Sequence, residues 1–390
     1  MIARLVLMGI ILGAILLAAP ALAGASPDTP LTLAEHRLAE LPTGHVDAYL
    51  REINQASAGY LPGLSFGQAL ATLGRGGFAP GSILKGLFNY LFREVVDDMS
   101  LLGKILVLTV GCAVLMQLGR AFQGEDVARL AQSVAYIALL GLAFASFAVA
   151  VRLAHTTVSD LTGLMTAELP LLTTLLVGSG AIATAALLHP LLVVAVNGIT
   201  WAVADLVLPL IFLAVIADIV GQLTGYRLDQ LASLLRQVGL WSMGLGLTVF
   251  LGLAAIYGAV GPVADGLTLR TSKFMAATFV PVVGKMFSDA AEIVFGSSLL
   301  LKQAVGVVGV LAVLFLVLMP LMKILALAFI YRLAGAVAAP VGAGTVADSL
   351  GSMGSALTLV AVALGAAGLM FFISVTILFS AGNPGLMALP

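Results

Sequence analysis

The chain has 390 residues, of which 61% are hydrophobic and only 9% are charged. A soluble domain carries roughly 25% charged residues, so this composition excludes a surface covered by water and requires lipid as solvent. The net charge of −1 and the absence of a basic run argue against a nucleic-acid-binding protein.

The N-terminal segment has the order of a secretory signal peptide. A short basic region with Arg4 precedes the apolar run Leu5–Leu17, and Pro20 then ends the helix before Ala21-Leu22-Ala23, a small-x-small cleavage site. This order distinguishes a cleaved signal from a spanning helix. We therefore predict residues 1–23 as a signal peptide, with an uncleaved first helix as the alternative.

Residues 24–98 have a much higher density of charge than the remainder of the chain. They hold five basic and eight acidic residues, whereas Met99 to Pro390 hold 12 and 11. A helix beginning at Ser82 would carry a polar stripe opposite an apolar one, and such a helix lies in the headgroup plane or packs on a partner. We predict that 24–98 form an exported amphipathic-helical region. The polar stripe consists of Lys85, Asn89, Arg93 and Asp97.

Residues 99–390 are predicted to form a multispan transmembrane domain. The stretch Pro190–Val220 is about 31 residues long, whereas a simple crossing needs roughly 20. Pro209 offers a break point, so two short or broken helices are expected there. The sequence thus predicts an all-α polytopic membrane protein with about seven or eight transmembrane helices, some of them broken. The other predicted segments are Leu101–Leu118, Leu130–Val151, Leu169–Leu188, Val238–Val260, Lys302–Met319 and Leu321–Val337 around Pro320, and Leu357–Ser380.

Orientation is weakly specified by the loops. Basic residues in short loops mark the cytoplasmic side, but the loops of this chain carry nearly balanced charge. The exported N-terminal region is the stronger constraint. It places a predicted loop Arg120–Arg129 inside and a predicted loop Arg152–Glu168 outside.

The sequence contains no pattern that indicates catalysis. It has no GxxxxGK[ST] phosphate loop, no HExxH and no CxxC, and its four histidines lack metal-ligand spacing on one helix. Its single cysteine, Cys112, can form neither an internal disulfide nor a metal site alone. The serine in Gly178-Ser179-Gly180 has no nearby base and is interpreted as a packing or bending position. We therefore expect no enzyme activity, no cofactor and no metal.

Two carboxylates lie at membrane depth in the long apolar stretch. Asp205 and Asp218 are costly in lipid, so they are expected to face a protein interior or a wet cavity. On an ideal helix they fall about 220° apart, so they share a face only if Pro209 breaks the helix between them. Lysines near the ends of apolar segments, Lys302 among them, are explained by snorkelling to the interface.

The stretch Asp265–Lys302 is the most polar part of the membrane domain. Lys285 and Asp289 form an i, i+4 pair, and Asp289 and Glu292 an i, i+3 pair. One interpretation is an interfacial connector stabilised by local ion pairs, and the other is a docking or gating segment. The candidate assembly or gating residues are Asp265, Arg270, Lys273, Lys285, Asp289, Glu292 and Lys302.

Several ordered motifs resemble the stage III sporulation protein AE family, and the likeness covers essentially the whole chain. They lie at consistent positions within the predicted membrane domain, although Asn rather than Gln is expected at position 303. The matching segments are Leu188-His189-Pro190-Leu191, Val207-Leu208-Pro209-Leu210, Asp265 to Phe274, Val280 to Lys285, Ser288 to Glu292, Ser298 to Gly306, Phe371-Phe372 and Ala381-Gly382-Asn383.

The resemblance implies a function that composition alone does not reveal. Members of this family are membrane subunits of a secretion-like sporulation channel complex that links mother cell and forespore. The resemblance implies a multi-pass location in the bacterial plasma membrane, namely the mother-cell membrane around the forespore. Its expected partners are the other membrane subunits, a secretion-type ATPase that supplies energy, a forespore-side channel protein and the bilayer. No catalytic residues belong to the family pattern.

The alternative is a secondary transporter or permease with a site at the broken helices around Asp205–Asp218. Transporters of this kind place polar groups at helix breaks near the midplane. Against this alternative, the two halves of the chain show no internal repeat, and few charges lie at membrane depth for ion coupling.

Overall fold

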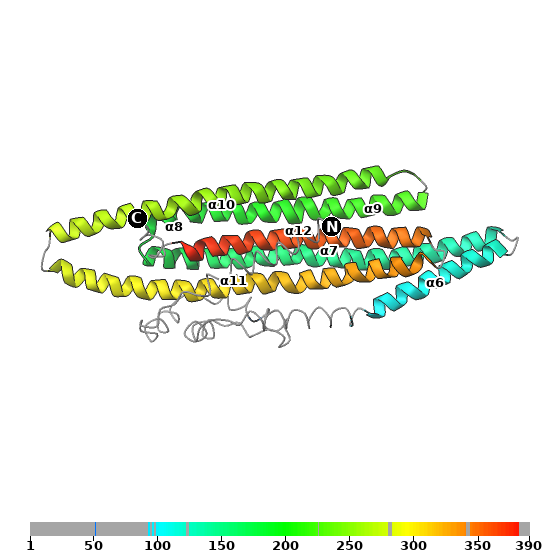
Figure 1. The fold of residues 1–390 in the computed structure, drawn as a ribbon, viewed down its shortest axis with the longest axis horizontal. Helices are drawn as coiled ribbons and strands as arrows, with labels where there is room; N and C mark the ends of the chain where they lie inside the picture. The colour runs from blue at the N-terminus through cyan, green and yellow to red at the C-terminus, as the bar shows by residue number, and fades with distance from the viewer. Residues whose placement is uncertain are drawn as a thin grey trace.

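Long helices dominate the structure and lie roughly along one axis (Figure 1). The computed structural model describes residues 99–121, 125–224, 226–279, 283–340 and 344–381, together with Arg51, Arg93 and Val96. Only the helical backbone is described for residues 101, 112–113, 115–121, 125–133, 135, 223, 257–279, 283–300 and 303–304. The predicted signal peptide and nearly all of the predicted exported region therefore lie outside the described residues.

The described residues form helices and no strand, which confirms the all-α prediction. A π-helical segment, η1, joins α8 to α9, so that the three elements form one continuous helical run. In chain order the elements are α6 (Met99–Ala121), α7 (Glu125–Gly178), α8 (Ile182–Thr200), η1 (Trp201–Val207), α9 (Leu208–Thr224), α10 (Asp229–Phe279), α11 (Val283–Ala338) and α12 (Gly344–Ser380).

Several of these helices are much longer than a membrane is thick. α7 has 54 residues and α11 has 56. At 1.5 Å per residue each is about 80 Å long. The hydrocarbon core of a bilayer is only about 30 Å thick, so these helices extend well beyond it on at least one side.

Five helical stretches in the described part of the chain are long and apolar enough to cross a membrane. The predicted count of seven or eight is therefore not confirmed. Separate predicted segments are joined in the structure, because the chain stays helical where loops or breaks were expected. The five stretches are Tyr136–Gly178, Ile182–Gln222, Asp229–Ile256, Val305–Ala338 and Gly344–Ser380.

In two places, predicted segments are joined into one helix, and this explains most of the difference between the predicted and the observed number of spans. The predicted loop Arg152–Glu168 lies inside α7, and Pro320 lies inside α11 rather than between two helices. A proline within a helix removes one backbone donor, but packing by neighbouring helices allows such a helix to continue. Here α11 packs against both α7 and α12.

The predicted span Leu169–Leu188 is instead divided by a tight reversal between α7 and α8. Gly180 has a φ of 88°, which an L side chain rarely adopts, so glycine is required at this corner. The N–H of Ser179 donates to the carbonyl oxygen of Leu175 at 2.9 Å, and that of Ala181 to Leu176 at 3.1 Å. The bending role assigned to Gly178-Ser179-Gly180 thus corresponds to this reversal.

The predicted break near Pro209 appears as a widened helix rather than as two helices. A proline at position 209 cannot donate a hydrogen bond, and its ring crowds the carbonyl of Asp205. Residues 201–207 adopt π-helical geometry just before it, and the N–H of Leu208 donates to the carbonyl oxygen of Val203, five residues earlier. The π segment thus gives the proline ring room within a continuous run.

The hydrophobic core is centred on α12, which packs against α7, α8, α9, α10 and α11. Its closest neighbour is the antiparallel α11 (Figure 1). A Cβ on Gly368 would lie 2.6 Å from both Cγ atoms of Val317, so only glycine permits this approach. On the other side, the buried hydroxyl of Tyr331 on α11 donates to the carbonyl oxygen of Ala143 on α7 at 2.7 Å.

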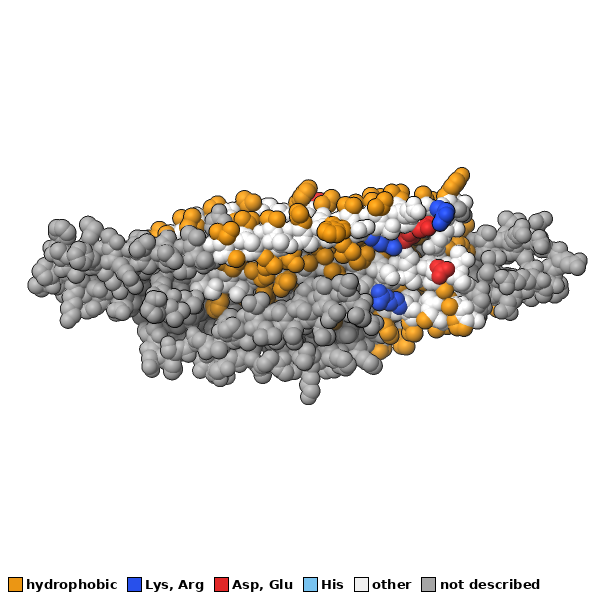
Figure 2. All heavy atoms as spheres, turned by 45° about the horizontal axis from the view of Figure 1, so that its top comes forward, with side chains coloured by type: hydrophobic (Ala, Val, Ile, Leu, Met, Phe, Trp, Pro, Cys, Tyr) orange, Lys and Arg blue, Asp and Glu red, His pale blue; other side chains and the backbone are white. Residues whose placement is uncertain are grey.

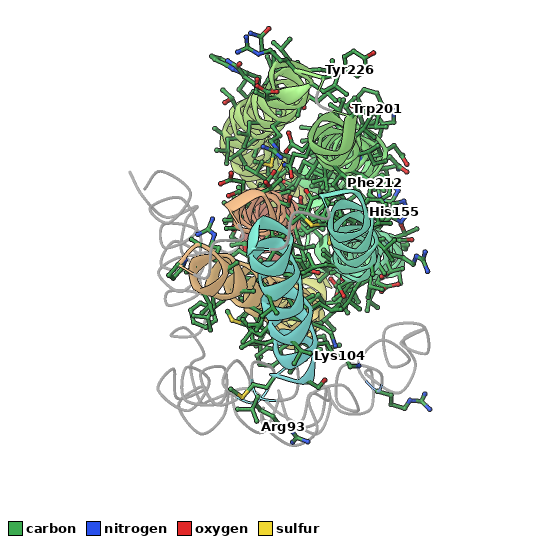
Figure 3. All side chains as sticks on the ribbon, turned by 90° about the vertical axis from the view of Figure 1, so that its right-hand side faces the viewer. Arg93, Lys104, His155, Trp201, Phe212 and Tyr226 are labelled. Atoms are coloured by element: carbon green, nitrogen blue, oxygen red, sulfur yellow. The ribbon has the colours of Figure 1, made fainter. Side chains whose placement is uncertain are left out.

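Aromatic side chains fill the contact between α7 and α9. The rings of Phe147 and Phe212 are stacked with centroids 6.1 Å apart, and Phe144 lies 5.4 Å from Phe212. Figure 3 looks along the bundle and shows Phe212 between these helices, whereas Trp201 and Tyr226 lie on the outside. Large exposed apolar side chains of this kind are expected of a surface in lipid.

Candidate functional site

A polar cluster joins four helices near one end of the bundle. Its centre is an ion pair between Asp218 of α9 and Arg236 of α10. Arg236 Nη2 donates to Asp218 Oδ2 and, at 2.9 Å, to Ser352 Oγ of α12. Ser352 Oγ in turn donates to Asp218 Oδ2 at 2.5 Å. The name Asp218–Arg236 cluster is used below for six residues. They are Asp218, Arg236 and Ser352, together with Tyr136, Gln222 and Ser349, which lie one helical turn away.

A second group of polar side chains lies one helical turn away. Gln222 is four residues after Asp218 on α9, and its Oε1 accepts from the Tyr136 hydroxyl of α7 at 3.2 Å. Ser349 Oγ of α12 donates to the same Gln222 oxygen. The hydroxyls of Tyr136 and Ser349 are 2.8 Å apart. The Asp218–Arg236 cluster therefore connects α7, α9, α10 and α12 through side chains.

Charge on this face of the molecule is concentrated toward one end. Figure 2 shows basic and acidic side chains gathered there, while most of the remaining described surface in that view is hydrophobic or neutral. The side chains of Asp218 and Arg236 are 12% and 22% exposed. They are thus largely withdrawn from solvent, and their mutual pairing compensates the loss of hydration.

The structure does not bring Asp205 and Asp218 into one site. Asp205 lies on η1 and is exposed, whereas Asp218 points inward to Arg236. Asp218 therefore has a partner in the protein interior, and Asp205 has an outward position at the π segment. The alternative of a transport site built from both carboxylates finds no support in this placement.

Lys302 is buried, so the snorkelling explanation does not apply to it. Its exposed fraction is 0%, and its ammonium donates to the carbonyl oxygen of Ala381 at the end of α12. The last carbonyls of a helix lack intrahelical donors and carry partial negative charge. Lys302 of α11 therefore caps the C-terminus of α12 and links the two helices at that point.

The other six candidate assembly residues lie around the junction of α10 and α11. Asp265, Arg270 and Lys273 fall in the last part of α10, and Lys285, Asp289 and Glu292 in the first part of α11. Their side chains lie outside the described part of the structure. The backbone nevertheless places both groups on the helices that flank residues 280–282, at one end of the bundle (Figure 1).

Glu168 is a buried carboxyl that sequence reasoning missed. The sequence predicts a loop over Arg152–Glu168, with Glu168 at its edge. The structure places it within α7 with an exposed fraction of 1%, and neither carboxyl oxygen has a hydrogen-bond partner. The sequence did indicate that Glu168 lies on a buried helical face, because the residues three and four positions before and after it are apolar. All four are buried in the structure, namely Leu164, Met165, Leu171 and Leu172.

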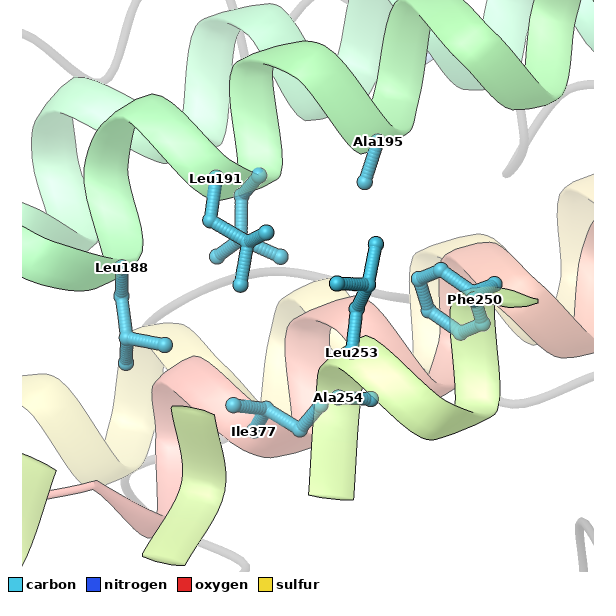
Figure 4. A pocket seen from close by; sticks show the side chains of 8 residues that line it. Leu188, Leu191, Ala195, Phe250, Leu253, Ala254 and Ile377 are labelled. Carbon is cyan, nitrogen blue, oxygen red and sulfur yellow. The ribbon is translucent and has the colours of Figure 1, made fainter. Parts of the chain in front are cut away.

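A small pocket between α8, α10 and α12 is entirely apolar in its lining (Figure 4). It offers no group that could bind a metal or take part in acid–base chemistry. Among the described residues, no three His, Cys, Asp or Glu side chains converge on one point. The pocket is lined by Leu188, Leu191, Leu192, Ala195, Phe250, Leu253, Ala254 and Ile377.

The apolar spans, the glycine-mediated helix packing and the inward polar contacts define a multi-pass helical membrane protein. Comparison with known proteins then gives its family. The profile of "Stage III sporulation protein AE" matches residues 64–382, and the chain belongs to this family. The stage III sporulation protein AE of Bacillus subtilis (strain 168) is 39% identical over 362 residues, covering 92% of this chain and 91% of that protein. No solved structure matches the chain.

Proposed function

We propose that this chain is an integral membrane subunit of the secretion-like channel complex that links mother cell and forespore during sporulation. Family membership along most of the chain is the observation that carries the proposal. It supports a role in sporulation directly. The proposal adds two statements to that role in sporulation. The chain is a subunit of the channel complex, and it lies in the mother-cell membrane.

The architecture is consistent with a subunit that works through contacts with other proteins. Residues 229–256 of α10 are largely exposed, and their outer side carries a shallow groove with Trp241 at 72% exposure. A bilayer covers such a surface, and so does a neighbouring membrane subunit. The remaining groove residues are Leu234, Gln237, Val238, Ser242 and Leu245.

The proposed function also requires particular partner proteins. Other membrane subunits of the stage III complex would pack against the spans, and a forespore-side protein would meet the exported region at 24–98. A separate secretion-type ATPase would supply energy, since the sequence has no nucleotide-binding motif. We assign the α10–α11 junction a role in assembly, because it concentrates charge in an otherwise apolar domain.

A complementation experiment tests both the function and the assembly role. A sporulating host that lacks its own copy would receive wild-type chain, no chain, or chains with Lys285→Glu, Asp289→Lys, or both. Without the chain, we expect gene expression in the engulfed forespore to stop and spore counts to fall. Each single reversal places like charges at i, i+4, whereas the double reversal restores an opposite pair.

We therefore expect the single variants to lose spore formation and recovery of partner subunits, and the double variant to regain both in part. Asp229→Lys is the matched control, because it reverses an exposed carboxylate at the start of α10, away from the α10–α11 junction. Normal sporulation without the chain would contradict the function. Normal behaviour of every reversal variant would contradict only the assembly role.

A further inference from the structure

The surroundings of Glu168 make it unlike every other described acidic residue. The other described carboxylates are exposed or half-buried, and Asp218 is paired with Arg236. Glu168 is in the first candidate span and faces α11 at Gly309. A Cβ on Gly309 would lie 2.6 Å from both Glu168 carboxyl oxygens, so the glycine leaves the space that the carboxyl fills.

An ionised carboxylate cannot be accommodated in this position. An isolated charge in a low-dielectric interior carries a desolvation cost that is a large fraction of the stability of a typical domain, unless a counter-charge or hydrogen bonds offset it. Glu168 has no hydrogen-bond partner for either oxygen. A metal cation does not resolve the problem, because hard cations require about six oxygen ligands and the described residues offer no acidic cluster here.

The charged and titratable groups on neighbouring elements do not supply a partner either. Lys302 lies on the same face of α11 as Gly309, but seven residues earlier, which is about 10 Å along the helix. Its ammonium is bound to the carbonyl oxygen of Ala381. Tyr331 is buried at the far end of α11 against Ala143. The remaining described groups on α6, α7, α8, α11 and α12 are exposed or half-buried, namely Lys104, Tyr136, Arg152, His155, Asp160, His189, Lys323, Arg332 and Asp348.

We propose that Glu168 is a proton-binding site inside the membrane-spanning bundle, and that release of its proton opens the contact between α7 and α11. In the packed arrangement the carboxyl is a neutral acid that fills the notch at Gly309. When the O–H bond breaks and the proton passes to water, the carboxylate left behind must be hydrated. Hydration requires α7 and α11 to separate locally, since no solvent reaches Glu168 in the packed arrangement.

The position of Glu168 in the helix favours local opening. Pro170 lies two residues later, and its missing N–H leaves the carbonyl of Thr166 without the usual i+4 donor. The stretch around Glu168 therefore has fewer backbone hydrogen bonds than a regular helix. Proton release would thus act on a part of α7 that already has a weakened hydrogen-bond ladder, and the remainder of the helix need not move.

The sign of the pH dependence follows from linkage. The packed state holds one proton that a glutamate in the unfolded chain, with a reference pKa of about 4.3, has lost at neutral pH. Stability therefore falls as pH rises above that value, by up to tenfold in the folding equilibrium per pH unit. Glu168→Gln keeps the shape and neutrality of the protonated side chain and removes this dependence.

The experiment uses the purified full-length protein in lipid nanodiscs. Infrared difference spectra of wild type and Glu168→Gln at neutral pH would show the carbonyl stretch of a buried protonated carboxylic acid, shifted in D2O and absent from the variant. Thermal stability between pH 5 and about 9 would fall more steeply for wild type than for Glu168→Gln. Asp229→Asn, which neutralises an exposed carboxylate at the start of α10, would retain the wild-type slope.

Hydrogen exchange tests the opening itself. Compared at one alkaline pH, where intrinsic exchange rates are equal, amides around Glu168 and Gly309 would exchange faster in wild type than in Glu168→Gln. Absence of a protonated-acid band at neutral pH would overturn the proposal, as would equal pH slopes for wild type and Glu168→Gln. A stability change that follows sodium concentration rather than pH would identify a cation site and overturn it equally. If the variant fails to fold, the D2O-sensitive band in wild type with isotopically labelled glutamate still decides the protonation state.

Discussion

In the Asp218–Arg236 cluster, side chains bond to side chains of other helices. Asp218 and Arg236 come from different helices, and Ser352 from a third. Within a membrane, unpaired polar groups are costly, so each such contact also fixes how its helices are placed. The Asp218–Arg236 cluster thus sets the position of α9 and α10 against α12 at one end of the bundle.

Removing both members of the ion pair should therefore cost less than the sum of the costs of removing each alone. We expect Asp218→Asn or Arg236→Gln alone to lower the free energy of unfolding by about 1–3 kcal/mol, between the values for exposed and fully buried pairs. The double variant should lose less than the sum of the two, because neither charge is left unpaired. Thermal unfolding in a mild detergent measures all three. Strictly additive losses would contradict an energetic coupling between the two side chains.

Residues differed in how well their environment could be predicted. Asp218 was expected to face an interior, because a carboxylate in a long apolar stretch needs a partner. Arg236 was not foreseen as that partner, since the pairing depends on how α10 folds back on α9. Glu168 was expected at the edge of the predicted loop Arg152–Glu168, whereas it lies within α7. The periodicity of the buried residues around it was the better guide.

At the level of whole helices, Pro320 does not end a helix, although the sequence predicts a break there. Pro320 and Pro170 both lie within continuous helices, because packing on neighbouring helices stabilises the chain on each side. Pro209 does disturb its helix, but as a π segment. The reversal at Gly180, in contrast, divides a stretch whose apolar composition predicted one span. Composition identifies membrane segments, whereas the ends of helices depend on contacts that composition does not encode.

The antiparallel pair of α11 and α12 should depend on glycine at position 368. Gly368→Ala would place a methyl group 2.6 Å from Val317, so the helices must separate locally. Overpacking of this kind costs about 1–3 kcal/mol. Gly351→Ala on the same helix is the control, because no atom lies within 4 Å of its Cβ position. Thermal unfolding should show a lower midpoint for Gly368→Ala only, and equal midpoints would contradict the packing role of Gly368.

At the scale of the whole molecule, the helices are too long for the membrane alone. A bundle whose members reach about 80 Å has ends that stand outside a hydrocarbon layer of about 30 Å. The α10–α11 junction lies at one such end of the bundle (Figure 1). Such ends offer surfaces to partners on either side of the membrane, which fits a subunit of a larger complex.

Under the proposed function, this membrane protein acts as a subunit of the sporulation channel complex. Affinity capture of the tagged full-length chain in mild detergent, from cells whose forespores have been engulfed, tests this role by identifying the captured proteins. We expect recovery of the other stage III membrane subunits and of a secretion-type ATPase, and their absence from cells harvested before sporulation. Capture of the chain alone from engulfed cells, under conditions in which those subunits recover one another, would contradict it.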